Sequence, residues 1–265
     1  MKYPRFEFSG SGEGAVSGDL PGHNLLDSAS HDQHFDTVVD GSFFSALPHE
    51  TRVYVMRHGQ SEGNATFTLQ GRLEYPLDEL GLEQAKAAAA WLADKQVDAI
   101  VSSPQRRAAV TASTVAEACG LPEPEYLPSL VEVDVGLFQG LTMTEAGSRH
   151  PEIFGQFRYR SWDGVPGAEH SPAMYARAVA SWARIRDLAI HGRRCIVCVS
   201  HGGLIQWLIR STFGVKTWLP LIPTSNCGIS QFDIEPTGQG LPAFVQWSRI
   251  NFKAPSVSQG ARPVF

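Results

Sequence analysis

The chain has 265 residues, of which 43% are hydrophobic, and it carries a formal net charge of −5 with a pI near 6.0. This length supports one domain with additions, or at most two, and the acidic balance without a long basic run argues against a nucleic-acid partner. No apolar run is long enough to cross a membrane and the N-terminus lacks an apolar signal core, so we expect a cytoplasmic protein without a membrane partner.

Residues 1–50 differ in composition from the rest of the chain, because they are rich in Gly, Ser, Asp and His and show little periodicity. We predict an N-terminal extension that is either loosely ordered or docked as a strap through the apolar patches "FEF", "FDTVV" and "FFSAL". The segment "HDQH" (31–34) offers half of a metal site. A solvated polar turn is the simpler interpretation, because no completing ligands are evident.

From Thr51 onward, apolar β-type runs alternate with amphipathic segments, which predicts a mostly parallel sheet with helices on both faces. In chain order we expect strands at 51–56, 97–103, 124–133 (weaker), 193–199, 227–234 and 243–250, and helices at 81–95, 103–120, 171–192 and 202–214. The last two strands, joined by the turn-rich "EPTGQG", form a predicted hairpin. The fold class is therefore α/β, a three-layer sandwich over residues 51–252, with a lid at about 142–172 and a tail at 253–265.

Local signals refine two of these helices. Leu82, Ala85, Ala89 and Leu92 form the apolar stripe expected to face the core. Ser103 and Pro104 give N-cap and N1 signals for the next helix, which the glycine at position 120 should end.

Cys195 and Cys198 form a CxxC motif, which is a pattern used in redox and metal sites. Here the motif lies inside a predicted buried strand, where residues three apart point to opposite faces of the sheet. A second CxxC, which a zinc site requires, is missing, so we interpret both cysteines as core residues and expect no metal.

Three chemically active segments each follow a predicted strand. Arg57-His58-Gly59 follows the first, Arg106 and Arg107 follow the second, and Ser200-His201-Gly202 follows the strand at 193–199. Ligands of open α/β sheets bind beyond the carboxyl ends of the strands, so parallel strands would bring all three segments together. Two arginines provide planar forks for phosphate oxygens, and a neutral imidazole is a nucleophile for phosphoryl transfer.

These motifs, in this order, resemble the histidine phosphatase superfamily, also called the phosphoglycerate mutase-like family. "RHGQSEGN" (57–64) resembles its signature, "SSPQRRAAVTA" (102–112) its second motif and "VSHGG" (199–203) its third. "LVEVDVGLFQGLT" (130–142) is similar to the segment that carries its catalytic acid, and "YPLDELGLEQA" (75–85) to the stretch between the first two motifs.

The resemblance implies a site that needs no metal or other cofactor. His58 would be the nucleophile that becomes phosphohistidine, and Arg57 would hold the phosphate. Asn64 would donate to a phosphate oxygen, although a helix cap is its simpler role. The arginine directly before alanine is the phosphate ligand of the second motif, which selects Arg107 over Arg106.

The resemblance also implies a second imidazole and an acid. His201 would complete the phosphate site, best as a protonated donor, so we expect its pKa and that of the neutral nucleophile to shift apart. Glu132 would protonate the leaving oxygen and later activate water; Asp134 and Glu169 remain alternatives. Some relatives place an aspartate after the second histidine, where this chain has Gly202. Further candidate phosphate or substrate contacts are Gln70, Gly71 and Gly202.

The segment after the acid favours a phosphatase over a mutase. Mutases of this family carry a longer insertion before the second histidine and a basic stretch after the acid. Here "VDVGLFQG" has no basic residue, and only 69 positions (201 minus 132) separate the two groups. We predict hydrolysis of a small organic monophosphate such as a sugar phosphate or a phosphoglycerate. The alternatives are a cofactor-dependent phosphoglycerate mutase and a non-catalytic binding regulator. The sequence leaves the oligomeric state open, with a homodimer as one option.

The predicted lid contains three arginines, at 149, 158 and 160, which its carboxylates nearly balance, so no second phosphate pocket stands out. Its four aromatic residues either line an apolar pocket or form the packing face of the lid. They are Phe154, Phe157, Tyr159 and Trp162.

Overall fold

The structure is a computed structural model that describes residues 35–238 and 240–255. It contains one six-stranded sheet in the order β3-β2-β4-β1-β5-β6, in which the first four strands are parallel and β5 pairs antiparallel with both β1 and β6. The predicted α/β class, mostly parallel sheet and C-terminal hairpin are confirmed. The strands are β1 (Thr51–Arg57), β2 (Ala99–Ser102), β3 (Glu125–Tyr126), β4 (Cys195–Ser200), β5 (Ile229–Glu235) and β6 (Phe244–Phe252).

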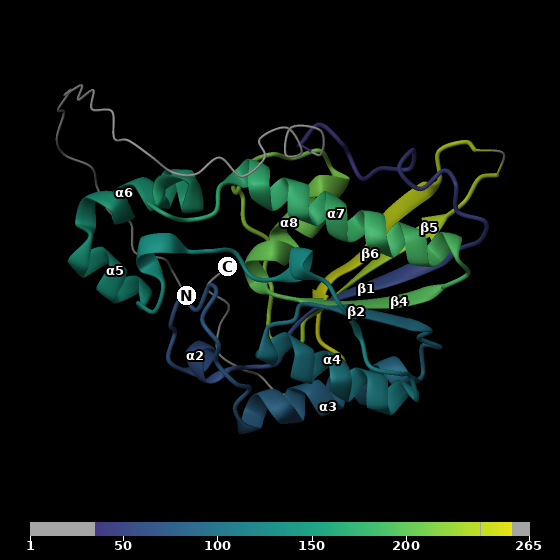
Figure 1. Ribbon diagram of the computed structural model, residues 1–265, viewed down its shortest axis with the longest axis horizontal. Coiled ribbons are helices and arrows are strands. Elements are labelled where there is room, and N and C mark those ends of the chain that lie inside the picture. The colour runs from purple at the N-terminus through teal and green to yellow at the C-terminus, as the bar shows by residue number, and fades with distance from the viewer. Residues whose placement is uncertain (1–34, 239, 256–265) are drawn as a thin grey trace.

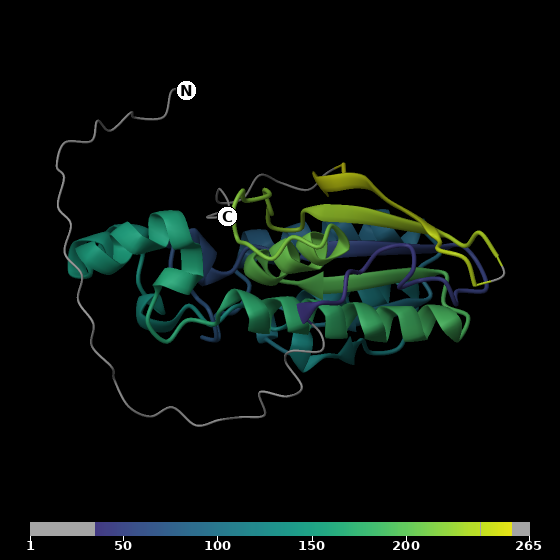
Figure 2. The same ribbon diagram turned by 90° about the horizontal axis from the view of Figure 1, so that it is seen from above.

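Helices cover both faces of the sheet (Figure 1). The helices α3 (Glu79–Ala93) and α4 (Arg106–Cys119) pack on one face, and α7 (Ser171–Ile190) and α8 (Gly202–Thr212) on the other. A separate group of short helices stands beyond the end of the sheet where the parallel strands finish (Figure 2). This group comprises α5 (Met143–Arg149), α6 (Pro151–Arg160) and the 3-10 turn η3 (Ser161–Gly164). The remaining helical elements, which do not belong to it, are the short helix α2 (Glu62–Ala65) and the 3-10 turns η1 (Pro128–Leu130) and η2 (Gly136–Phe138).

The two faces of β4 explain the CxxC motif. Cys195 belongs to the core cluster under α3 and α4, whereas Cys198 belongs to the cluster under α7 and α8. Both thiols are free, and burial raises the pKa of each to about 12. The two side chains therefore point in opposite directions, as the strand pattern predicts, and they act as core residues.

The described part of the N-terminal extension docks on the domain. Val39, Phe44 and Leu47 are buried, and the Val39 N–H donates to the Ser211 carbonyl at 2.9 Å. The Phe44 ring meets Trp182 edge to face with centroids 6.0 Å apart. Residues 35–47 thus form a strap over α7 and α8, whereas "FEF" and "HDQH" lie outside the described residues.

Three local predictions are wrong. Leu82 is 41% exposed, because Gly81 and Gln84 take the buried positions of that turn of α3. Helix α4 begins at Arg106 rather than at Ser103, since the Ser103 hydroxyl binds groups outside the helix. The strand predicted at 124–133 shrinks to Glu125–Tyr126, where Pro128 begins the turn η1.

Candidate active site

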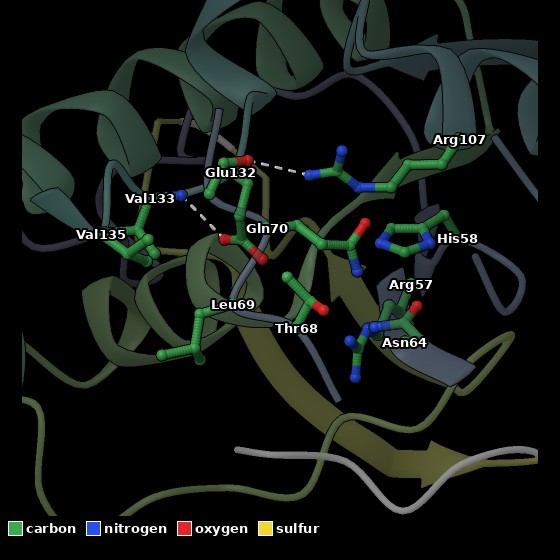
Figure 3. A pocket seen from close by; sticks show the side chains of 11 residues that line it. Arg57, His58, Asn64, Thr68, Leu69, Gln70, Arg107, Glu132, Val133 and Val135 are labelled. Atoms are coloured by element: carbon green, nitrogen blue, oxygen red, sulfur yellow. Dashed lines mark hydrogen bonds between the residues drawn. The ribbon is translucent and has the colours of Figure 1, made fainter. Parts of the chain in front are cut away.

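The carboxyl ends of neighbouring parallel strands bring the predicted segments together. In the β1–β4 pair Arg57 lies opposite Ser200, and the His58 N–H donates to the Ser200 carbonyl at 3.0 Å. On the other side of β4, Ser102 of β2 lies opposite Val199. The residues that follow these three strands therefore share one edge of the sheet, where His58 after β1 and Arg107 after β2 line a pocket (Figure 3).

His58 has a fixed orientation at this edge. Its ring is almost completely buried, and Nδ1 lies 2.6 Å from the Gly59 carbonyl oxygen. A carbonyl oxygen only accepts, so Nδ1 carries the proton and Nε2 keeps its lone pair. Gly59 is required here, since a Cβ atom would lie 2.4 Å from the Gly81 carbonyl oxygen.

Both site histidines are neutral at neutral pH. The ring centroids of His58 and His201 are 5.0 Å apart. Burial, together with the positive charges of Arg107 and Arg57, holds the pKa of each imidazole well below its usual value of 6.5. The prediction of opposite pKa shifts is therefore wrong, because burial and the same two guanidinium groups lower the pKa of both rings.

A serine hydroxyl holds one ring nitrogen of His201. The Gln105 N–H donates to Ser103 Oγ (3.2 Å), and this hydroxyl lies 2.8 Å from His201 Nε2. A hydroxyl has one proton and two lone pairs, so Ser103 either donates to Nε2 or accepts from it, and the ring proton is then on Nδ1 or on Nε2 respectively. Among the described residues, the buried Nδ1 has no hydrogen-bond partner. A neutral His201 thus retains an N–H donor.

Two buried guanidinium groups carry the positive charge of the site. Arg57 donates to the Thr224 carbonyl (2.7 Å), and Arg107 donates to the carbonyls of Leu73 (2.8 Å) and Gly71 (3.0 Å). Burial and the neighbouring Arg107 charge lower the pKa of Arg57 to about 10, against the opposing charge of Glu132, so it stays cationic at neutral pH. Neither arginine Nε atom has a partner in the described part of the chain.

The arginine next to Arg107 takes no part in the pocket. The Arg106 side chain is exposed, and its backbone N–H donates to a carboxylate oxygen of Glu74 at 3.0 Å. Of the two adjacent arginines, the structure places only Arg107 on the pocket wall.

Two amide side chains complete the polar wall. Asn64 Oδ1 accepts from the N–H and the hydroxyl of Ser61 and from Asn226 Nδ2 at 3.0 Å, so its NH₂ group is the part left for the pocket. Asn64 thereby serves as a helix cap as well as a pocket residue. Gln70 Oε1 lies 2.9 Å from the same Ser61 hydroxyl, whose one proton Gln70 and Asn64 share, and the next residue, Gly71, also lines the pocket.

Of the three candidate acids, only Glu132 lines the pocket (Figure 3). Its Oε1 accepts from the Val133 N–H at 2.8 Å and its Oε2 from the Gly203 N–H at 3.2 Å. Asp134 instead binds the Gly136 N–H, and Glu169 forms an ion pair with Arg177 at 2.6 Å.

Gly202 and His201 are not among the pocket-lining residues. Gly202 is the first residue of α8, next to His201. The further pocket residues that the sequence did not single out are Thr68, Leu69, Val133 and Val135. Val133 and Val135 carried a signal, because they alternate in "VEVDV" beside Glu132.

The lid aromatics pack against one another rather than lining the pocket. Phe154, Phe157 and Trp162 all surround Phe138, with ring centroids 6.2, 5.8 and 6.4 Å from it. Tyr159 is 67% exposed. The three lid arginines are exposed on the surface of α5 and α6. In the described ranges no cluster of His, Cys, Asp and Glu fits a metal ion, and no helix is long and apolar enough to cross a membrane.

A family model of the histidine phosphatase superfamily (branch 1) matches residues 53–247. A metal-independent phosphoserine phosphatase of Arabidopsis thaliana is 33% identical over 159 residues, which are 59% of this chain and 66% of the relative. A 2-carboxy-D-arabinitol-1-phosphatase of Triticum aestivum is 29% identical over 210 residues, which are 77% of this chain and 41% of the relative. The chain thus matches less than two thirds of the length of either relative.

Solved structures of proteins named as hydrolases or phosphatases share the fold of this chain. A mycobacterial glucosyl-3-phosphoglycerate phosphatase, solved with VO3, superposes with a TM-score of 0.65 at 29% identity, covering 76% of this chain and 99% of that one. A protein described as mycobacterial hydrolase 2 gives a TM-score of 0.67 at 28% identity, covering 78% of this chain and 92% of that one. The chain belongs to the histidine phosphatase superfamily.

Proposed function

We propose that this histidine phosphatase superfamily member hydrolyses small organic phosphomonoesters through a phosphohistidine on His58. One observation carries the proposal: the imidazole is neutral, its Nδ1 is tied to the Gly59 carbonyl, and its Nε2 lone pair is free beside two buried cations. A nucleophile with a fixed tautomer next to a preformed anion site needs little rearrangement before it attacks phosphorus.

The pocket supplies a partner for each phosphate oxygen. Arg57 and Arg107 provide charged donors and the NH₂ group of Asn64 provides a neutral one, while His201 lies outside the pocket wall with its ring centroid 5.0 Å from that of His58. Gln70 and Gly71 line the same wall. Donors that are fixed before the substrate arrives stabilise the charge of the transferred phosphoryl group without reorganisation.

Two steps complete the reaction. His58 Nε2 forms a bond to phosphorus while the bond from phosphorus to the ester oxygen breaks, and Glu132 in its acid form gives its proton to that oxygen. Water then attacks the phosphohistidine, the Glu132 carboxylate takes a proton from it, and the N–P bond breaks to release inorganic phosphate. No metal ion or other cofactor is needed in either step.

The substrate's organic part lies against a wall of mixed character. Leu69, Val133 and Val135 supply apolar surface, and Thr68 adds a hydroxyl. The relatives named above act on phosphoserine, 2-carboxy-D-arabinitol 1-phosphate and glucosyl-3-phosphoglycerate, all of which are small organic monophosphates. The residues at 142–172, which include α5 and α6, form the lid over this part of the site.

Hydrolysis is favoured over phosphoryl transfer between metabolites. The segment after Glu132 has no basic residue to hold a second phosphate, and the pocket-facing residues that follow it are valines. A mutase must keep its phosphohistidine away from water until the phosphate is returned to the substrate.

The test is phosphate release by the full chain from a panel of monophosphates, with His58→Ala as the control. Brief mixing with substrate followed by denaturation should trap an acid-labile phosphohistidine in the wild type but not in the variant. Interconversion of phosphoglycerates that depends on 2,3-bisphosphoglycerate would show a mutase instead. No turnover and no trapped phosphate on any substrate would favour a binding protein.

A further inference from the structure

A buried glutamine connects the separate parts of the pocket. Gln105 lies between β2 and α4, directly before the helix, and its side chain makes no capping bond to α4. Instead its amide bridges two other segments. The Glu132 backbone N–H donates to Gln105 Oε1 at 2.7 Å, and Gln105 Nε2 donates to the Gly71 carbonyl at 3.1 Å.

The backbone of the same residue reaches the second histidine. The Gln105 N–H donates to Ser103 Oγ, which contacts His201 Nε2. The Gly71 carbonyl also accepts from Arg107. Gln105, which lies outside the pocket wall, therefore binds the backbone of Glu132 and Gly71 directly. Through the Ser103 hydroxyl it is connected to His201, and through the Gly71 carbonyl to Arg107.

The Glu132 backbone is held from two sides. Arg177 of α7 donates to the carbonyls of Val131 (2.7 Å) and Ser129 (2.9 Å). Gln105 holds the Glu132 N–H from the side of α4, at the residue whose carboxylate enters the pocket. Without this amide, a buried N–H would have no partner, and the peptide would move to find one.

We propose that Gln105 is a positioning residue that places the Glu132 carboxyl relative to the phosphate bound at Gly71 and Arg107. This inference rests on the proposed function, because it concerns the proton given to the leaving oxygen. It predicts a selective defect. A displaced acid impairs esters whose leaving oxygen needs a proton, whereas p-nitrophenolate leaves without one.

The experiment compares p-nitrophenyl phosphate with β-glycerophosphate for the full-length wild type and Gln105→Leu, which has a similar shape but no amide. We expect kcat/KM for β-glycerophosphate to fall about 10- to 100-fold and the value for p-nitrophenyl phosphate to fall by less than about 3-fold. Gln105→Glu keeps an acceptor for the Glu132 N–H, so its kcat/KM for β-glycerophosphate should return most of the way to the wild-type value. If Gln105→Leu fails to fold, Gln105→Met carries the same prediction.

The matched control is Gln206→Leu. Gln206 is also a buried glutamine that binds backbone groups with both ends of its amide, at Ile222, and it lies outside the proposed machinery. The Gln206→Leu variant should have a lower melting temperature than the wild type, but the same ratio of kcat/KM for β-glycerophosphate to kcat/KM for p-nitrophenyl phosphate.

The outcomes separate the two proposals. Equal losses on both esters in Gln105→Leu, with wild-type turnover intact, would overturn the positioning role and leave the phosphatase standing. No turnover of either ester by the wild type would overturn the proposed function, and the positioning role with it.

Discussion

Acidification should destabilise this protein through its two buried histidines, even without substrate. The folded state holds His58 and His201 neutral, since burial and two guanidinium groups depress both pKa values well below 6.5. In the unfolded chain both rings titrate near 6.5. The stability from the neutral rings is therefore fully present above pH 6.5 and is lost as the pH falls towards the folded-state pKa values.

Proton linkage gives the size of this effect. Between about pH 7 and about pH 5.5, a ring that titrates near 6.5 only in the unfolded chain lowers the free energy of unfolding by about 1.2 kcal/mol. Two such rings give about 2.5 kcal/mol. This is a large share of the stability of a typical domain, which lies at about 5–15 kcal/mol.

The assay is urea unfolding at these two pH values in a phosphate-free buffer, because a bound anion would stabilise the folded state. His58→Asn keeps a donor for the Gly59 carbonyl, and His201→Gln keeps a group that reaches Ser103. Each single variant should lose about half of the pH-dependent difference, and the double variant nearly all of it. A double variant with the wild-type pH dependence would refute the reasoning.

Three further perturbations test the site. Glu132→Gln should lower kcat/KM for alkyl phosphates about 100-fold or more but for p-nitrophenyl phosphate by less than about 10-fold, in steady-state kinetics; equal losses would point to another acid. Gly203→Ala would place a Cβ atom 2.5 Å from Glu132 Oε1, so the same ester selectivity should appear without any change to the acid itself. Among the residues that the structure describes, Arg177→Met leaves the largely buried Glu169 carboxylate with Arg72 as its one charged partner, and urea unfolding should show a loss of about 2–3 kcal/mol; an unchanged midpoint would show that the pair contributes little.

The positions of Arg57, His58 and His201 at one edge of the sheet could be predicted from where they follow strands in the sequence and from the parallel pairing of those strands. Arg57 and His58 end one apolar strand and Ser200 and His201 end another, and parallel pairing of β1 with β4 makes these ends neighbours. The α/β pattern predicts parallel pairing because helices intervene between the strands. Nothing about the side-chain contacts was needed to predict this convergence.

The supporting residues carried no such signal. Gln105 sits in a motif where arginine is the informative position, and Ser103 reads locally as a helix cap. Asn226, which donates to the His58 carbonyl and to Asn64, is 162 positions from its asparagine partner. Contacts of this kind depend on how loops from different strands meet, and neither spacing nor periodicity encodes that meeting.

The protonation of His201 shows what the local pattern lacked. The motif "VSHGG" (199–203) predicts that His201 donates a hydrogen bond to phosphate, and a protonated imidazole is the simplest such donor. In the folded protein the nearby Arg57 and Arg107 charges oppose a third cation, and burial removes the water that would stabilise it. A neutral imidazole still carries one N–H, so the ring keeps a donor without that charge. A dianion in the pocket would cancel the repulsion from both arginines, so substrate binding, rather than the fold, would be the step at which this ring gains a charge.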